Sequence, residues 1–132
     1  SHEFMWEGME HMQEMARYDS DKRIREAAGL AIQDLYKVHL LRLEDIKKDI
    51  KDKKSSSKGK NHDLKMLKEK EEELLKKEVL IQKMINDIIK NEKNDSVLEV
   101  WKNAGFVELE LTIIKKDPVK EASAQEQKQP EK

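Results

Sequence analysis

Two long segments of helical periodicity, separated by a serine- and lysine-rich break, restrict this chain to a small set of folds. The break, residues 52–61, contains no apolar side chain, so burial cannot offset the entropy that the segment would lose on ordering. The flanking segments, residues 20–51 and 62–92, each predict a helix about 45 Å long. Helices of matched length joined by one loop favour a long antiparallel αα-hairpin.

The segment at 62–92 has the hydrophobic period of a coiled-coil seam. Apolar residues follow one another at spacings of three and four. The seam positions are Leu64, Leu67, Glu71, Leu74, Glu78, Ile81, Ile85 and Ile88. The two glutamates weaken a long dimeric zipper but suit a hairpin in which one side of the seam reaches solvent.

The segment at 20–51 has an apolar stripe of the same kind, which contains His39. We interpret His39 as a packed residue, with a pH-sensitive role at an interface as the alternative. Gly29 lies inside this helix, where glycine costs about 1 kcal/mol relative to alanine. It therefore predicts a close crossing by a neighbouring helix.

A shorter helix is expected at residues 5–18, where methionines and Ala16 follow a 4-3-4 spacing. Such a methionine-rich face fills a core or adapts to a partner, and we favour the core. Residues 1–4 resemble a protease-site remnant and a cloning-site dipeptide, so we leave them out of the fold prediction. We expect the rest to be a fragment of a longer chain.

Beyond residue 94 the pattern changes twice. Asp95 or Ser96 can cap a short helix at 95–104, and Gly105 follows where a left-handed residue ends a helix. Apolar residues then alternate with polar ones at 106–114, which is the period of a half-buried strand. The apolar set is Val107, Leu109, Leu111 and Ile113.

A single strand needs a partner, such as a second copy, another protein or further parts of a parent chain. The alternatives are that helix packing overrides the pattern or that residues 106–114 lie extended along the bundle. Residues 117–132 have the composition of a disordered tail. Together these patterns predict one all-α domain at 5–116, a helical bundle built on the hairpin with one candidate strand.

The composition excludes several classes of protein. The 27 basic and 28 acidic residues nearly cancel, so the whole chain has no field that would draw it to nucleic acid or an anionic membrane. Cysteine is absent, which excludes disulfides and favours an intracellular protein, cytoplasmic or nuclear. The sequence contains no apolar run of about 18 residues, so it predicts no membrane span.

No group of residues predicts catalysis or cofactor binding. His11, His39 and His62 lie on separate elements without the spacing of a metal site, and Gly59 matches no phosphate-binding loop. Glu71, Glu72 and Glu73 splay around a helix axis, so they form a solvated face. We therefore expect no enzyme, no metal, no cofactor and no small-molecule substrate.

A basic cluster surrounds the break between the long helices. Lys53, Lys54, Lys58 and Lys60 are candidate contacts for phosphates or an acidic partner. The simpler interpretation is a solvated tip beside a helix C-terminus, which favours positive charge. No aromatic residue interleaves with the lysines, so stacking on nucleic-acid bases is not expected.

The stretch from Asp19 to Leu35, preceded by the apolar helix from Met5, resembles a HEAT or armadillo repeat, in which a short helix turns through an aspartate-containing loop into a second helix. Asp21 corresponds to the turn, and Ile24 with Arg25 corresponds to the family's Val-Arg pair. The positions that match its packing residues are Ala27, Ala28, Ala31 and Leu35. The resemblance implies a protein-binding scaffold, the terminal part of a larger helical repeat.

We conclude from the sequence that the chain is a non-enzymatic interaction or scaffold module. It would bind another protein or a second copy, through the strand and the seam. The candidate contact residues are Val107, Leu109, Leu111, Ile113, Leu67, Leu74 and Ile81. Binding of nucleic acid or another acidic surface through the lysine-rich tip is the alternative.

Overall fold

The computed structural model describes residues 2–55 and 61–114. Four helices follow one another in this part of the chain: α1 His2–Tyr18, α2 Lys22–Ser55, α3 Asn61–Asn91 and α4 Asp95–Asn103. Residues 106–114 continue from α4 as an extended segment, and no strand forms within the described ranges. The all-α class is therefore confirmed. The predicted tail at 117–132 lies outside the described residues.

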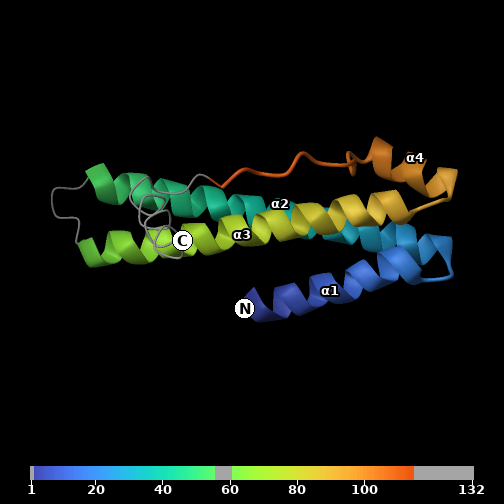
Figure 1. Cartoon of the computed structure of the whole chain (residues 1–132), viewed down its shortest axis with the longest axis horizontal. Coiled ribbons are helices and arrows are strands. Elements are labelled where there is room, and N and C mark those ends of the chain that lie inside the picture. Colours follow the sequence, from blue (N-terminus) through green and yellow to red (C-terminus); the bar gives the residue numbers. More distant parts are fainter. Residues whose placement is uncertain (1, 56–60, 115–132) are drawn as a thin grey trace, which may run out of the picture.

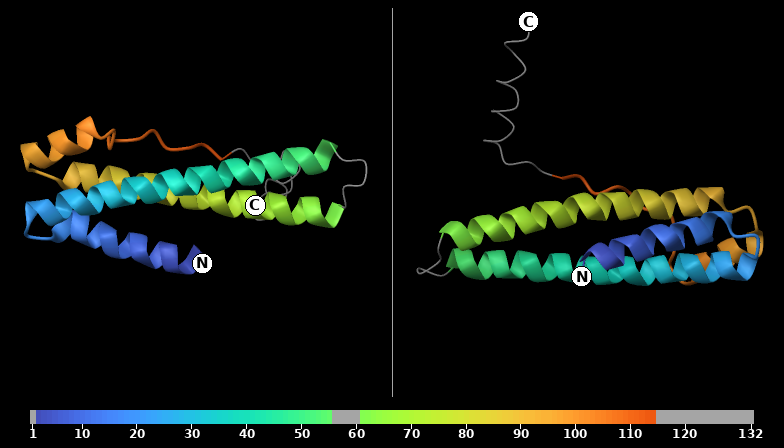
Figure 2. Two further views of the ribbon diagram at one scale, coloured as in Figure 1. Left: turned by 180° about the vertical axis from the view of Figure 1, so that it is seen from behind. Right: turned by 90° about the horizontal axis from the view of Figure 1, so that it is seen from below.

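The αα-hairpin is the longest feature of the molecule (Figure 1). Helices α2 and α3 run antiparallel along its whole length, and α1 packs back along the half that lies away from the hairpin tip. Helix α4 crosses the same end, which we call the base. The views in Figure 2 place α1 and the extended segment on opposite sides of the hairpin.

Helix α2 extends further toward the tip than the sequence predicted, whereas α3 differs from its predicted range by one residue at each end. Helix α2 continues to Ser55, so residues 52–55 are helical rather than part of the loop. The Ser55 hydroxyl donates to the Lys51 carbonyl at 3.0 Å, and Lys53 and Lys54 lie in the last turn, where positive charge suits the helix dipole. Residues 56–60 lie outside the described part. Helix α1 begins at His2, within the residues left out of the prediction.

The core lies at the base, where all four helices meet. Its buried members come from every helix and from the first residue of the extended segment. They are Met9, Ala16, Ala28, Ile32, Ile81, Met84, Ile85, Ile88, Val97, Trp101 and Phe106. Met9 is fully buried and Met12 and Met15 pack against the core, so the methionine face of α1 is a core face, as we favoured.

Buried apolar side chains from both long helices fill the seam of the hairpin. Leu43 and Ile50 of α2 are buried, as are Leu74 and Ile81 of α3. His39 is also buried, and its Nε2 lies within hydrogen-bond distance of the Leu74 carbonyl oxygen, at 2.8 Å. The packing role that we favoured for His39 is confirmed.

Glu78 is not at a solvent-facing side of the seam, contrary to the prediction. Its side chain is buried, because the extended segment covers it. The Thr112 hydroxyl donates to its Oε1 at 2.7 Å. The break in the apolar seam therefore marks a polar internal contact.

Helix α4 begins at an asparagine cap and is followed by a glycine in the left-handed conformation. Asn94 is the N-cap, not Asp95 or Ser96, because its side-chain oxygen accepts from the backbone N–H groups of Ser96 and Val97. Gly105 has a φ of +81°, the left-handed conformation expected after the helix. This turn sends the chain back along α3.

No helix among the described residues has the length and apolar character needed to cross a membrane.

Gly29 is the site of the predicted close crossing, and the crossing helix is α4. A Cβ built on Gly29 would lie 2.7 Å from Trp101 Cε2 and Cζ2, which is closer than a Cβ atom approaches a non-bonded carbon in folded proteins. Both residues are buried, so the indole ring has little room to move. The Trp101 ring therefore packs directly against the backbone of α2 at Gly29.

Replacement of Gly29 by alanine is expected to destabilise the fold, although alanine is the better helix former. The overlap with Trp101 costs about 1 to 3 kcal/mol, against a propensity gain of about 1 kcal/mol. Urea unfolding followed by far-UV circular dichroism measures the balance. Gly8→Ala is the matched control, because nothing lies within 4 Å of a Cβ there, and it should stabilise. A G29A variant more stable than wild type would contradict the crossing.

Candidate interaction surface on the strap

Residues 106–114, which we call the strap, do not form the predicted strand. Strand pairing would put every second residue on the same face. Instead the residues turned toward the bundle are Phe106, Leu109 and Thr112, at three-residue spacing. No neighbouring strand lies beside the strap within residues 2–55 and 61–114, and side chains of α3 take the place of a strand ladder. The alternative, an extended segment along the bundle, is what the structure shows.

Asn86 of α3 binds both main-chain groups of Leu109. Its Nδ2 donates to the Leu109 carbonyl at 2.9 Å, and its Oδ1 accepts from the Leu109 N–H at 2.7 Å. A side-chain amide has one donor and one acceptor side, so it pairs with the strap as a neighbouring strand would. The Leu109 side chain packs against the core from this position.

Gln82, one helical turn earlier, holds Thr112. Its Oε1 accepts from the Thr112 N–H and its Nε2 donates to the Thr112 hydroxyl, both at 2.7 Å. The same Nε2 donates to the Tyr36 hydroxyl at 2.9 Å, which ties α2 to the network. Burial raises the pKa of Tyr36; the hydrogen bond from Gln82 opposes this, and the charge of Glu78 adds to it, so the phenol stays neutral.

The strap exposes apolar side chains beside the exposed carboxylates of Glu108 and Glu110. The exposed fractions are 44% for Val107, 42% for Leu111 and 86% for Ile113. Three of the four predicted contact residues of the strap are thus exposed, although Val107 also borders a cavity between α2 and the strap, whereas Leu109 packs against the core. Exposed large apolar side chains grouped on one segment are typical of protein contacts.

The predicted contact residues of the seam lie elsewhere. Leu74 and Ile81 are buried between α2 and α3, and Leu67 is half-buried. Leu74 and Ile81 hold the hairpin together from inside it, whereas Leu67 keeps part of its surface accessible. The prediction failed for Leu74 and Ile81 because a seam period is the same whether the second helix belongs to the same chain or to another.

The lysine-rich tip is only partly described. Lys53 and Lys54 are exposed, and Lys53 Nζ lies 3.6 Å from Asp63 Oδ2 across the hairpin. Lys58 and Lys60 lie outside the described residues. The ion pair is exposed at both ends, so it contributes little to stability.

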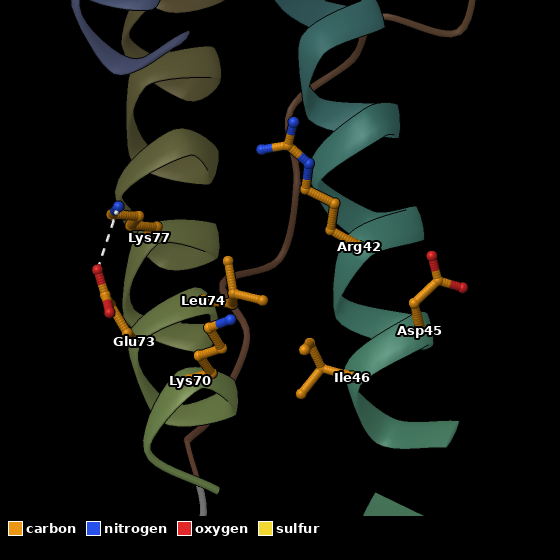
Figure 3. Close-up of a pocket in the computed structure, with 7 residues that line it drawn as sticks. All are labelled: Arg42, Asp45, Ile46, Lys70, Glu73, Leu74 and Lys77. Atoms are coloured by element: carbon orange, nitrogen blue, oxygen red, sulfur yellow. Dashed lines mark ion pairs between the residues drawn. The ribbon is translucent and has the colours of Figure 1, made fainter. Parts of the chain in front are cut away.

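A groove of about 220 Å³ opens between the two long helices, away from the base (Figure 3). Ile46 and Leu74 contribute the apolar part. The charged residues that line it have both signs: Arg42, Asp45, Lys70, Glu73 and Lys77. Glu73 is paired with Lys77 at 3.3 Å. In the part of the chain that the structure describes, no three acidic or histidine side chains are grouped so that they could hold a metal ion.

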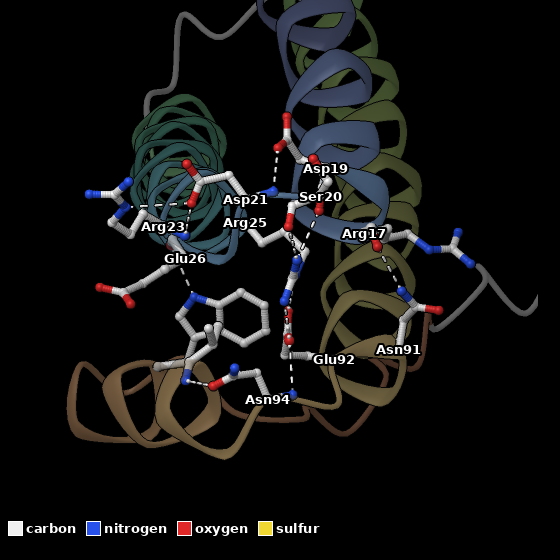
Figure 4. A network of polar contacts seen from close by, with 12 residues as sticks. Arg17, Asp19, Ser20, Asp21, Arg23, Arg25, Glu26, Asn91, Glu92 and Asn94 are labelled. Atoms are coloured by element: carbon white, nitrogen blue, oxygen red, sulfur yellow. Dashed lines mark hydrogen bonds and ion pairs between the residues drawn. The ribbon is translucent and has the colours of Figure 1, made fainter.

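Arg25 anchors the base of the bundle (Figure 4). Its Nε and Nη2 donate to the two carboxylate oxygens of Glu92 at 2.8 and 3.1 Å, and its Nη1 donates to the carbonyls of Asp19 and Ser20. One side chain thus joins the α1–α2 turn to the α3–α4 connection. The Glu92 side chain is only 2% exposed.

The pKa of Glu92 reflects this setting. Burial by itself would raise that pKa, but the hydrogen bonds from Arg25 and from the Asn94 N–H hold it below its ordinary value of 4.5. The hydrogen bonds to Glu92 raise the pKa of Arg25, because they outweigh the desolvation of its guanidinium group. The pair is therefore charged at neutral pH.

Sequence reasoning did not identify Gln82, Asn86 or Glu92. A signal existed for the first two, because Glu78, Gln82 and Asn86 recur at four-residue spacing beside an apolar seam. Polar residues in line along one helix face predict a polar contact with another segment. Glu92 gives no such signal, because its partner Arg25 is 67 residues away in the sequence.

Comparison of the chain with protein-family models, with curated proteins and with solved structures gives no significant match. The HEAT or armadillo resemblance therefore stays a prediction. Helices α1 and α2 form one pair around the turn at Asp19–Asp21, and nothing among the described helices repeats that pair.

Proposed function

We propose that this chain is a non-enzymatic helical interaction module that binds a protein partner, first of all a second copy of itself, through the outer side of the strap. The observation that carries the proposal is the exposure of Val107, Leu111 and Ile113 on a segment whose inner side is fixed by α3. The bundle supplies a rigid support, and the strap supplies an apolar contact. The lack of cysteine is consistent with an intracellular location.

A second candidate is the binding of an acidic surface through the lysine-rich tip. Lys53 and Lys54 favour it, because they are exposed at the end of a projecting hairpin. The same lysines also have a structural explanation in the helix dipole and in the ion pair with Asp63. The strap is the better supported surface, because burial would stabilise its apolar side chains only on contact with a partner.

Charged residues on the outer side of the strap test the proposal. Light scattering over a range of concentrations should show wild-type mass rising from 15.6 kDa toward the dimer, whereas Leu111→Glu with Ile113→Glu stays at the monomer mass. Both side chains are exposed, so the melting temperature should change little.

The matched control replaces Lys53 and Lys54 by glutamine. It should associate like wild type, and a loss of association only in this variant would favour the tip. A wild-type chain that stays monomeric would contradict self-association, and the partner would then be a different protein. Equal association by the wild-type and glutamate variants would exclude the strap face.

A further inference from the structure

The face of α3 beneath the strap has the properties of a peptide-binding site. We propose that Glu78, Gln82 and Asn86 form a recognition site for an extended peptide with an aromatic residue, a leucine and a threonine at three-residue spacing. The strap occupies this site as an intramolecular ligand, and a peptide with the same pattern can replace it. This site uses the inner side of the strap, so it is separate from the outer contact surface.

Main-chain recognition is the first part of the argument. Asn86 satisfies the N–H and the carbonyl of Leu109, and Gln82 accepts from the N–H of Thr112. These bonds depend on the path of the bound chain and not on its side chains. Gln82 and Glu78 are buried beneath the strap, and each has a hydrogen-bond partner on Thr112. An occupant that buries these polar groups without pairing them would pay the cost of unsatisfied hydrogen bonds, so the site discriminates against a chain that cannot supply the same partners.

Side-chain recognition occurs at three positions. Phe106 is buried against Trp101 in an edge-to-face contact, with ring centroids 5.1 Å apart. Leu109 packs on the core. The Thr112 hydroxyl accepts from Gln82 and donates to Glu78, each at 2.7 Å. A residue without a hydroxyl would remove one hydrogen bond from each of these two groups, so the site selects for threonine or serine.

The strap is positioned for exchange. It leaves α4 at Gly105, the one described residue with a positive φ, and the conformational freedom of glycine lets the chain change direction there. A cavity of about 220 Å³ remains between α2 and the strap, bordered by Tyr36, Leu40 and Ile85, so the strap does not fill the groove. A free peptide must compete with a tethered segment whose effective concentration is in the millimolar range.

A labelled peptide with the sequence of residues 105–114 tests the site by fluorescence anisotropy. The full chain with Leu109→Asp, in which the tethered strap is weakened, should bind it roughly tenfold more tightly than wild type. Addition of Asn86→Ala to that variant should remove the binding. A peptide with the leucine replaced by aspartate should bind to none of the three proteins.

If the L109D chain loses its helical circular dichroism, Thr112→Val takes its place, because valine has the shape of threonine without the hydroxyl. Equal binding by wild type and the folded strap variant, or binding that persists with N86A, would overturn the proposal. The Leu111→Glu, Ile113→Glu chain should bind the peptide as weakly as wild type. The two proposals can thus fail separately.

Discussion

Replacement of Trp101 by alanine is expected to lower the free energy of unfolding by about 4 kcal/mol, because it removes a large side chain from the core. The indole is fully buried at the base, where it covers Gly29 and contacts the ring of Phe106. Its Nε1 also donates to the Glu26 carbonyl at 3.0 Å. Loss of the ring would leave a cavity where α2, α4 and the strap meet.

The measurement is urea unfolding followed by circular dichroism, with Trp101→Phe as the matched variant. Phenylalanine retains an aromatic ring on Gly29 and loses the hydrogen bond, so its cost should be well below that of alanine. A W101A chain that is destabilised by less than about 1 kcal/mol would show that α4 is not part of the cooperative core.

Replacement of Arg25 by alanine is expected to lower the free energy of unfolding at neutral pH by more than the loss of a surface ion pair would, because it leaves the Glu92 carboxylate without its cation. Arg23→Ala is the matched control. Arg23 is 85% exposed and its pairing with Asp21 is at the surface, so its loss should cost less than about 1 kcal/mol. Equal costs for the two variants would contradict the role of the buried pair.

The pH dependence of R25A distinguishes the ion pair from simple packing. In the wild type the folded-state pKa of Glu92 is depressed, so its contribution is present above the unfolded value of 4.5 and is lost as the pH falls through the folded pKa. In the variant, burial without Arg25 raises that pKa, so acid no longer destabilises through this group. The stability difference between the two proteins should therefore shrink below neutral pH. A pH-independent difference would indicate packing alone.

The helices were predictable from the sequence, because their apolar periods are local. Ile81, Ile85 and Ile88 repeat at the spacing of one helix face, and Gly29 by itself indicated a close crossing. Trp101 could not be assigned to that crossing, since 72 positions separate it from Gly29 in the sequence, a difference that no local pattern encodes.

The strap was only half predictable. The alternation of Val107, Leu109 and Leu111 with glutamates is a genuine period of two, and it indicated an extended chain correctly. It did not reveal the partner, because the groups that bind the strap are side-chain amides of a helix. Those amides impose a three-residue register, which moves Leu111 from the expected inner face to the outside.

Amide hydrogen exchange across the strap of the wild-type chain, followed residue by residue by NMR, tests the central claim most directly. The N–H groups of Phe106, Leu109 and Thr112 donate to the Trp101 carbonyl, Asn86 and Gln82, so these three should be protected while those between them exchange rapidly. Protection of every second amide would indicate a paired strand. Rapid exchange of all of them would mean that the strap is not docked on α3, which would contradict both the support of the outer surface and the recognition site beneath it.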